Sequence, residues 1–171
     1  NLGVAIPGGG NPAVPALVPL PVELNAGCSC TVANVAIAIG INHPNVQDVS
    51  LALFPPVGED DLQSSDGDSV ILFDGPPSDA NLVPGNLITF DDSASGALNP
   101  LTLGDDVDGS GNILAGTYFA PLLSEGSFVS GGLGKFNGET AAGDWTLEGF
   151  DFAVGNTGTI ESVELTITCA V

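Results

Sequence analysis

One short segment of the chain spaces oxygen-bearing side chains as calcium loops do. In the run DVDGSGNI, which begins at residue 106, Asp106, Asp108 and Ser110 stand at alternate positions and a glycine follows in sixth place. EF-hand loops use this spacing because the glycine permits a sharp bend that turns the oxygens toward one Ca²⁺ ion. The twelfth position here is Thr117 rather than glutamate. The segment therefore predicts either a calcium loop that a carboxylate from elsewhere completes, or a solvated acidic turn.

A second candidate for a cation site is the pair Asp91-Asp92, which directly follows the apolar segment LITF. Two adjacent carboxylates at the end of a strand repel each other unless backbone amides donate hydrogen bonds to them or a hard cation bridges them. Asp48, in the turn before another apolar segment, is the candidate for a third ligand. We expect calcium as the cofactor of these sites.

The chain offers little material for catalysis. It contains one histidine, His43, and no Gly-x-Ser-x-Gly nucleophile sequence. Carboxylate pairs are frequent because 21 of the 171 residues are acidic, so their spacing alone does not indicate a glycoside hydrolase. We therefore expect that the protein is not an enzyme.

The charge balance restricts the partners. A single basic residue, Lys135, stands against 21 acidic ones, which gives a formal net charge of −20. Such a surface repels nucleic acid and anionic lipid, and its compaction is opposed unless salt or bound cations screen the carboxylates. Composition leaves open whether the acidic surface suits a saline habitat or binds calcium specifically. Since no apolar run approaches the ~20 residues of a membrane-spanning helix, we expect no membrane insertion.

The cysteines and the absence of methionine predict export. The chain begins at Asn1 and holds no methionine, as expected for a mature chain whose signal peptide has been removed. Cys28 and Cys30 lie near one end of the chain and Cys169 near the other. In an exported protein this arrangement favours a disulfide that joins Cys169 to either Cys28 or Cys30. We expect a secreted protein, located extracellularly or at the cell surface.

Alternating apolar residues predict strands through most of the chain. In residues 35–41 the large apolar side chains fall on one face and small residues on the other, and in residues 163–169 apolar residues alternate with glutamate and threonine. Trp145 alternates with Leu147, which places the single tryptophan in the core. Many short strands separated by Gly, Pro, Asp and Ser, without helical periodicity, predict an all-β sandwich.

The first 27 residues differ from the rest, and we expect an extended apolar arm at residues 1–27 before a β-sandwich domain at residues 28–171. Residues 1–22 carry no charge and five prolines, which exclude a helix and make a poor central strand. This arm either lies on a neighbouring copy, which predicts self-assembly into a filament or surface layer, or folds back over its own sheet. The side chains expected to make these contacts are Val4, Ile6, Val14, Leu17, Val18, Leu20 and Val22.

Four segments resemble the P domain that accompanies subtilisin-like proteases and proprotein convertases, in its bacterial form. They read GINHPNVQDVSLALFPP, LITFDDSAS, AGTYFAP and FNGETAAGDWTLEGFDFAVGNTGTIESVELTI, and they occur in the order expected for the family. The resemblance implies a jelly-roll β-sandwich without catalytic residues of its own. It further implies that His43 orients a turn by hydrogen bonding and that Asp91-Asp92 binds calcium. Two long acidic segments and the near absence of basic residues depart from the family pattern.

Two functions follow from these observations. The first is a non-catalytic, calcium-stabilised structural subunit that assembles with copies of itself through the arm. The alternative, implied by the resemblance, is an accessory P domain that stabilises or targets a secreted protease. Because the arm is uncharged and apolar, the sequence favours assembly over the accessory role.

Overall fold

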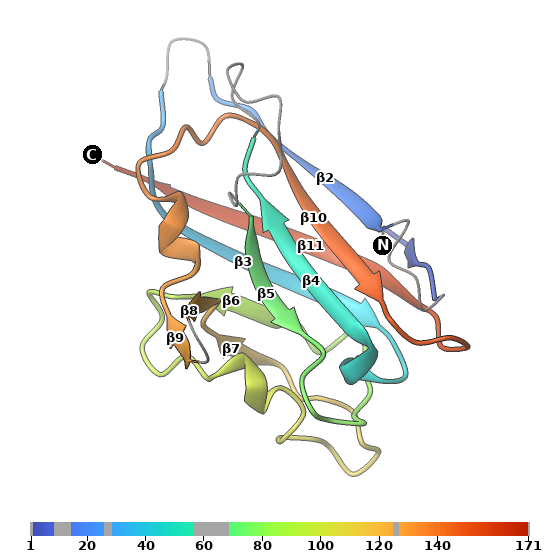
Figure 1. Ribbon diagram of the computed structural model, residues 1–171. Coiled ribbons are helices and arrows are strands. Elements are labelled where there is room, and N and C mark those ends of the chain that lie inside the picture. Colours follow the sequence, from blue (N-terminus) through green and yellow to red (C-terminus); the bar gives the residue numbers. More distant parts are fainter. Residues whose placement is uncertain (1, 9–14, 26–28, 57–68, 125–126, 171) are drawn as a thin grey trace.

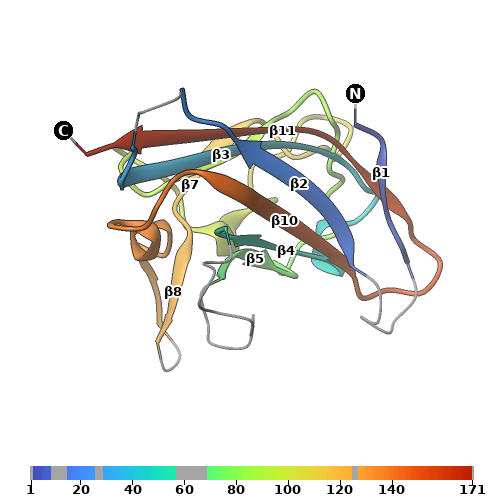
Figure 2. The ribbon, with the colours of Figure 1, turned by 90° about the horizontal axis from the view of Figure 1, so that it is seen from above.

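The computed structural model is an all-β sandwich, as predicted, and it describes residues 2–8, 15–25, 29–56, 69–124 and 127–170. Two sheets lie in separate layers, one behind the other in Figure 1 and one above the other in Figure 2. The strands are β1 (Val4–Ile6), β2 (Ala16–Val22), β3 (Val32–Asn42), β4 (Val49–Phe54), β5 (Val70–Asp74), β6 (Ile88–Asp91), β7 (Gly116–Tyr118), β8 (Pro121–Ser124), β9 (Ser127–Ser130), β10 (Gly143–Asp151) and β11 (Gly158–Cys169). Three 3₁₀ turns accompany them: η1 (Val46–Asp48), η2 (Pro100–Thr102) and η3 (Leu133–Phe136).

In each sheet, strands from the two ends of the chain lie beside strands from its middle. The five-stranded sheet has the order β1-β11-β3-β6-β7, and the four-stranded sheet has the order β2-β10-β4-β5. The long strands β3 and β11 pair antiparallel from Asn42↔Thr159 at one end to Val32↔Cys169 at the other. A separate hairpin is formed by β8 and β9. Most pairings therefore join residues far apart in the sequence.

The core lies between the two sheets and follows the alternation of the sequence. Ile37, Ile39 and Ile41 on β3 are almost fully buried, because every second side chain of a strand points to the same face. Trp145 of β10 is also fully buried, and its ring meets that of Phe136 edge to face at 5.1 Å between centroids. The indole Nε1 donates a hydrogen bond of 2.9 Å to a backbone carbonyl. The single tryptophan is thus a core residue, as predicted.

Two prolines that argue against a strand are accommodated because β2 is an edge strand. Pro19 pairs with Thr146 and Pro21 with Asp144 on β10, which is the sole neighbour of β2 within the four-stranded sheet. Pro19 and Pro21 have the same parity, so their missing N–H groups fall on the outer edge while the residues between them bond to β10. The same prolines interrupt the outer edge and oppose the addition of a further strand there.

The described part of the N-terminal arm belongs to the sandwich of its own chain. β1 pairs with β11, and β2 pairs with β10, so the arm contributes one edge strand to each sheet. Ile6 is fully buried and Val18 is 3% exposed, whereas Leu17 faces outward and is 51% exposed. Val4, Leu20 and Val22 pack partly buried against the core. Val14 lies outside the described residues.

This placement differs from the separation expected at residue 27, and it corresponds to the alternative in which the arm folds back over its own sheet. The physical reason is that each sheet would otherwise expose the edge of a long strand and the apolar side chains behind it. No contact with a second copy is needed for the described residues of the arm to bury their apolar side chains.

A disulfide joins Cys30, just before β3, to Cys169 at the end of β11, with 5.2 Å between the Cα atoms. The sequence left Cys28 and Cys30 as alternative partners, and Cys28 lies outside the described residues. The bond closes a sequence separation of 139 residues and holds the ends of two neighbouring strands together. Within the described ranges, no helix has the length and apolar character needed to span a membrane.

Candidate functional site

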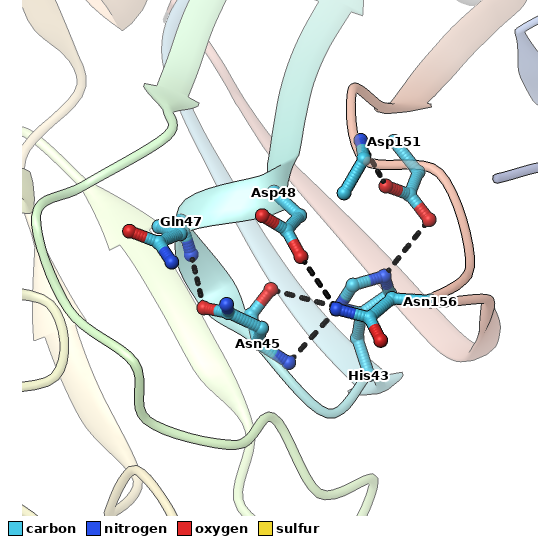
Figure 3. A network of polar contacts seen from close by, with 7 residues as sticks. His43, Asn45, Gln47, Asp48, Asp151 and Asn156 are labelled. Carbon is cyan, nitrogen blue, oxygen red and sulfur yellow. Dashed lines mark hydrogen bonds and ion pairs between the residues drawn. The ribbon is translucent and has the colours of Figure 1, made fainter. Parts of the chain in front are cut away.

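A buried histidine–carboxylate pair lies in a network of polar contacts (Figure 3). His43 directly follows β3, and Asp151 is the last residue of β10. The imidazole Nε2 lies 3.1 Å from Oδ2 of Asp151, and both side chains are inaccessible to solvent. The pair therefore links the end of a strand in one sheet to the end of a strand in the other.

The second imidazole nitrogen contacts the backbone of the following turn. Nδ1 of His43 lies 2.7 Å from the carbonyl oxygen of Asn45 and 3.1 Å from its amide nitrogen. A neutral ring protonated at Nε2 accepts from the Asn45 N–H, and a ring protonated at Nδ1 donates to the Asn45 carbonyl. Each tautomer thus has a backbone partner at Nδ1, so the turn can hold the ring in either tautomer.

The turn after His43 is closed by its own side chains. Oδ1 of Asn45 accepts a hydrogen bond of 3.2 Å from the backbone N–H of Gln47 and caps η1. The Gln47 side chain in turn donates to Asp79 over 2.8 Å. This local order fixes the position at which β4 begins.

The hairpin between β10 and β11 is fastened to the same turn. Nδ2 of Asn156 donates a 2.8 Å hydrogen bond to Oδ2 of Asp48, and the Phe152 N–H donates to the Asp48 carbonyl, also over 2.8 Å. Oδ1 of Asp151 accepts from the Ala153 N–H at 2.9 Å. Asp48, predicted as a metal ligand, is here a hydrogen-bond acceptor that orients a hairpin.

Two glycines bring backbone against the buried pair from different sides. Gly8 forms a bridge with Asp151, and a Cβ atom at Gly8 would approach the Asn156 carbonyl oxygen to 2.0 Å. A Cβ atom at Gly158 would lie 2.4 Å from Cδ2 of the His43 ring. The segment after β1 therefore lies against Asp151 and Asn156, and the start of β11 lies against the histidine ring. With both ring nitrogens bonded to the chain, the arrangement supports a structural tie rather than access of a substrate to the imidazole.

The adjacent carboxylates Asp91 and Asp92 each receive hydrogen bonds from the chain. Oδ1 of Asp92 accepts from the Ala120 N–H at 2.7 Å, and its Oδ2 accepts from the Leu133 N–H at 2.7 Å and the Gly134 N–H at 3.4 Å. These amides belong to segments on either side of the β8–β9 hairpin, so Asp92 joins the start of η3 to the residue before β8. Backbone amides thus occupy the Asp92 oxygens that a cation was predicted to need.

Asp91 has other partners than Asp92 and organises the turn after β6. Its Oδ1 accepts from the Ser93 N–H at 2.9 Å and the Ser93 hydroxyl at 2.6 Å, and it lies 3.5 Å from Nδ2 of Asn34. Partial burial acts to raise the pKa of Asp91, but the hydrogen bonds from Ser93 and Asn34 outweigh it and lower the pKa.

The structure does not bring Asp48 to the Asp91–Asp92 pair. Asp91 pairs with Ala36 of β3, whereas Asp48 bonds to the hairpin that leads into β11 beside Asn42. Ala36 and Asn42 are six residues apart on one strand, a separation of about 20 Å. Asp91 therefore lies beside the middle of β3, whereas Asp48 lies near the end of β3 at Asn42. The order of the turns in the sequence does not reveal which part of a sheet each turn occupies.

The loop predicted to bind calcium is held by hydrogen bonds to one of its own carboxylates. Asp108 accepts from the backbone N–H groups of Asn112 at 3.0 Å and Ser110 at 2.8 Å, and from the Asn112 side chain at 2.9 Å. These bonds, with those from Asn112 the largest contribution, lower the pKa of Asp108. Asp106 contributes a carbonyl oxygen to Leu114. Within the described part of the chain, no three His, Cys, Asp or Glu side chains gather as a metal site.

Sequence reasoning missed the carboxylate at the centre of the cluster. Asp151 follows Trp145, Leu147 and Gly149 in the inward-facing alternation of β10, and all four positions point to the core. A carboxylate on a core face requires a partner, and the only histidine in the chain was the available candidate. This signal was present, but only a known strand register could have paired residues 108 positions apart.

Comparisons with known proteins give distant structural matches. No family model and no curated protein matches the sequence. Among solved structures, the chain is similar to a complex of the Aeromonas sobria serine protease with its chaperone, at 20% identity and a TM-score of 0.49, and to the Aeromonas sobria serine protease, at 19% and 0.48. Each match covers 96% of this chain and 24% of the other, so the chain spans about a quarter of the length of the structures it matches.

Proposed function

We propose that this chain is a non-catalytic β-sandwich module that accompanies a secreted serine protease, as its resemblance to P domains implies. The observation that carries the proposal is that polar residues from two segments with this resemblance contact one another. His43, Asn45 and Asp48 come from the first segment, and Asp151 and Asn156 come from the last. These residues connect turns of the chain through hydrogen bonds. The contacts therefore support a structural role for side chains whose types alone would also be compatible with catalysis or metal binding.

Export belongs to the same proposal. The Cys30–Cys169 disulfide favours a compartment outside the cytosol, because thiols in the cytosol are kept reduced. A net charge of −20 keeps the chain away from nucleic acid and anionic lipid, and it favours partners that carry basic groups.

The outer face of the four-stranded sheet is the surface that best fits such a partner. Leu17, Glu148, Ala52 and Ile71 lie side by side across the four strands, and three of these four side chains are apolar. Burial between these neighbours raises the pKa of Glu148, so its carboxylate lacks the solvation that an isolated surface acid has. An apolar partner surface with one basic side chain opposite Glu148 would complement this row.

A second apolar element adjoins the row on the same strand. The rings of Phe150 and Phe152 are stacked at 6.3 Å between centroids, and Phe152 is 45% exposed. Exposed aromatic residues are enriched in protein interfaces because they bury a large area with few rotatable bonds. Leu17, Ala52, Ile71, Glu148 and Phe150 together make up the outer face of the four-stranded sheet.

The test is the thermal inactivation of a subtilisin-like catalytic domain from the same organism, measured with and without this chain. We expect the chain to lengthen the half-life of the protease and to hydrolyse no peptide or ester substrate alone. Leu17→Asp should abolish the effect, because it places a charge in the outer face at a position that is 51% exposed. Thr166→Asp is the matched control, since this exposed residue adds the same charge to the other sheet. An unchanged half-life with the wild-type chain would contradict the proposal.

A further inference from the structure

The strand β1 occupies a position on the sheet edge that Gly158–Ile160 of β11 and the Asn156 backbone form, and this position is its groove. Its ladder with β11 runs from Ile6↔Gly158 to Val4↔Ile160, and the Leu2 N–H extends it with a 2.7 Å bond to the Glu161 carbonyl. Ile6 is fully buried among core side chains, although it lies on a strand of three residues at the sheet edge. Figure 2 shows β1 beside the start of β11, at the opposite end of the molecule from the end of that strand.

The groove recognises a particular sequence. A large apolar side chain fills the position of Ile6, and two residues later only glycine fits, because any Cβ at Gly8 would lie 2.0 Å from the Asn156 carbonyl oxygen. Ile6-Pro7-Gly8 is the single Ile-x-Gly sequence in the chain. Ile6 and Gly8 satisfy both positions in this structure, and the same residues of another copy would satisfy them equally.

The strand and its groove can meet without bringing charges together. Residues 1–22 contain no charged side chain, although the chain as a whole carries a net charge of −20. Residues 7–15, which link β1 in one sheet to β2 in the other, could span up to about 30 Å when extended. The number of residues in this link therefore limits the reach of β1 from β2 to about 30 Å.

We propose that β1 is an exchangeable strand, and that the groove beside Gly158–Ile160 of one copy accepts residues 4–8 of a second copy. The contacts between copies would be the same as those within one copy, so exchange costs little beyond the loss of the short tether. Successive exchange in one direction joins copies head to tail. This inference is independent of the accessory role, because it uses the β11 edge rather than the outer face.

The test uses the register of the full-length chain. Ala5 pairs with Thr159 across the β1–β11 ladder, so one chain carrying Ala5→Cys is mixed with a second carrying Thr159→Cys, both in a Cys28→Ser background. Exchange places the new cysteines opposite each other, and oxidation should yield a covalent dimer of twice the 17.0 kDa chain mass. We expect the yield to rise with protein concentration and with salt, which screens the repulsion between copies.

Two controls make each outcome decisive. Glu164→Cys replaces Thr159→Cys in the matched control, because residue 164 lies on β11 beyond the reach of β1, and we expect at least about tenfold less dimer. The double variant Ala5→Cys/Thr159→Cys in one chain should close an internal bond and show that the pair can react. If this internal bond forms but the mixed chains give no more dimer than the control, the strand does not exchange and the proposal is wrong.

A second measurement does not depend on engineered cysteines. The full-length Ile6→Asp variant cannot seat its own strand, so its groove should bind a labelled peptide of residues 1–8, and binding is followed by fluorescence anisotropy. A peptide with Gly8→Ala should bind at least about tenfold more weakly, because its Cβ meets the Asn156 carbonyl. Equal binding of both peptides would contradict the recognition argued from Ile6 and Gly8. Near-ultraviolet circular dichroism of Trp145 reports whether the variant keeps its fold.

Discussion

Replacement of Asp151 by alanine and by asparagine should have clearly different costs, because the two changes treat the buried histidine differently. Alanine removes the acceptor at 3.1 Å from Nε2 of His43 and the acceptor for the Ala153 N–H. A buried donor without a partner costs about 1–3 kcal/mol, and loss of a typical hydrogen bond adds about 1 kcal/mol. We therefore expect Asp151→Ala to lower the free energy of unfolding by about 3 kcal/mol.

The asparagine variant offers His43 a way to keep its hydrogen bonds. The side-chain amide that Asp151→Asn introduces can donate an N–H to Nε2 if the imidazole proton moves to Nδ1, where the Asn45 carbonyl lies at 2.7 Å. The oxygen of the same amide still accepts from the Ala153 N–H. The geometry thus permits a change of tautomer without movement of the ring, and we expect Asp151→Asn to cost only about 1 kcal/mol.

The assay is urea unfolding of the oxidised protein, followed by the fluorescence of Trp145, which is fully buried. With a slope of about 2 kcal/mol/M, the alanine variant should shift the midpoint by about 1.5 M and the asparagine variant by about 0.5 M. Asp144→Ala, at an exposed position of the same strand, serves as the control and should shift it little. Equal costs for the two changes at residue 151 would refute the tautomer argument, and negligible costs for both would refute the structural role of the pair.

Further predictions concern the remaining carboxylates, the disulfide and calcium. Burial raises the pKa of Glu148 above its unfolded value, so its favourable contribution is present at low pH and lost as pH rises through the folded pKa; Glu148→Gln should therefore stabilise the fold more at pH 7 than at pH 3 in thermal melts. Asp92→Asn should lower the free energy of unfolding by about 1–3 kcal/mol in urea, because the NH₂ group of the new side chain must face a backbone N–H donor. The same change at the exposed Asp105 should cost little. Reduction of Cys30–Cys169 should cost about 4–5 kcal/mol for so long a closed loop, and a melting temperature unaffected by reductant would contradict this. A calcium site saturated at 100 times its dissociation constant would add about 2.7 kcal/mol, so a chelator should lower the melting temperature at low salt, and identical melts would end the calcium hypothesis.

The sequence was sufficient to predict the class of fold and the interior of its sheets. The alternation in residues 35–41 has a period of two, and the corresponding side chains are buried in β3. Trp145 could be assigned to the core for the same reason. Such local patterns decide which face of a strand is buried, whatever strand lies beside it.

The candidate site could be predicted only in part, because it depends on contacts between distant segments. His43 was identified as a residue that orients a turn through the resemblance, but its partner Asp151 is 108 positions away. The loop from Asp106 has the spacing of a calcium loop, yet Asn112, which was not singled out, provides two donors to Asp108. Donors from the backbone are invisible to a spacing argument, because every residue type except proline supplies them.

The prolines of the arm show that a correct local rule can still leave the position of a segment undecided. Pro19 and Pro21 argue against a central strand, and this rule holds, but it does not exclude an edge strand with the prolines on its outer side. Whether an apolar segment covers its own sheet or a neighbouring one depends on the edges that the complete fold leaves free. That information exists only once the order of the strands is known.

The most direct test of the central claim is the half-life of a secreted subtilisin-like protease at elevated temperature, measured with this chain and its two charge variants. The proposed accessory role predicts a longer half-life with the wild-type chain and with Thr166→Asp, and no change with Leu17→Asp. The same half-life in all samples, including the protease alone, would contradict the role of this sandwich as a protease-associated module.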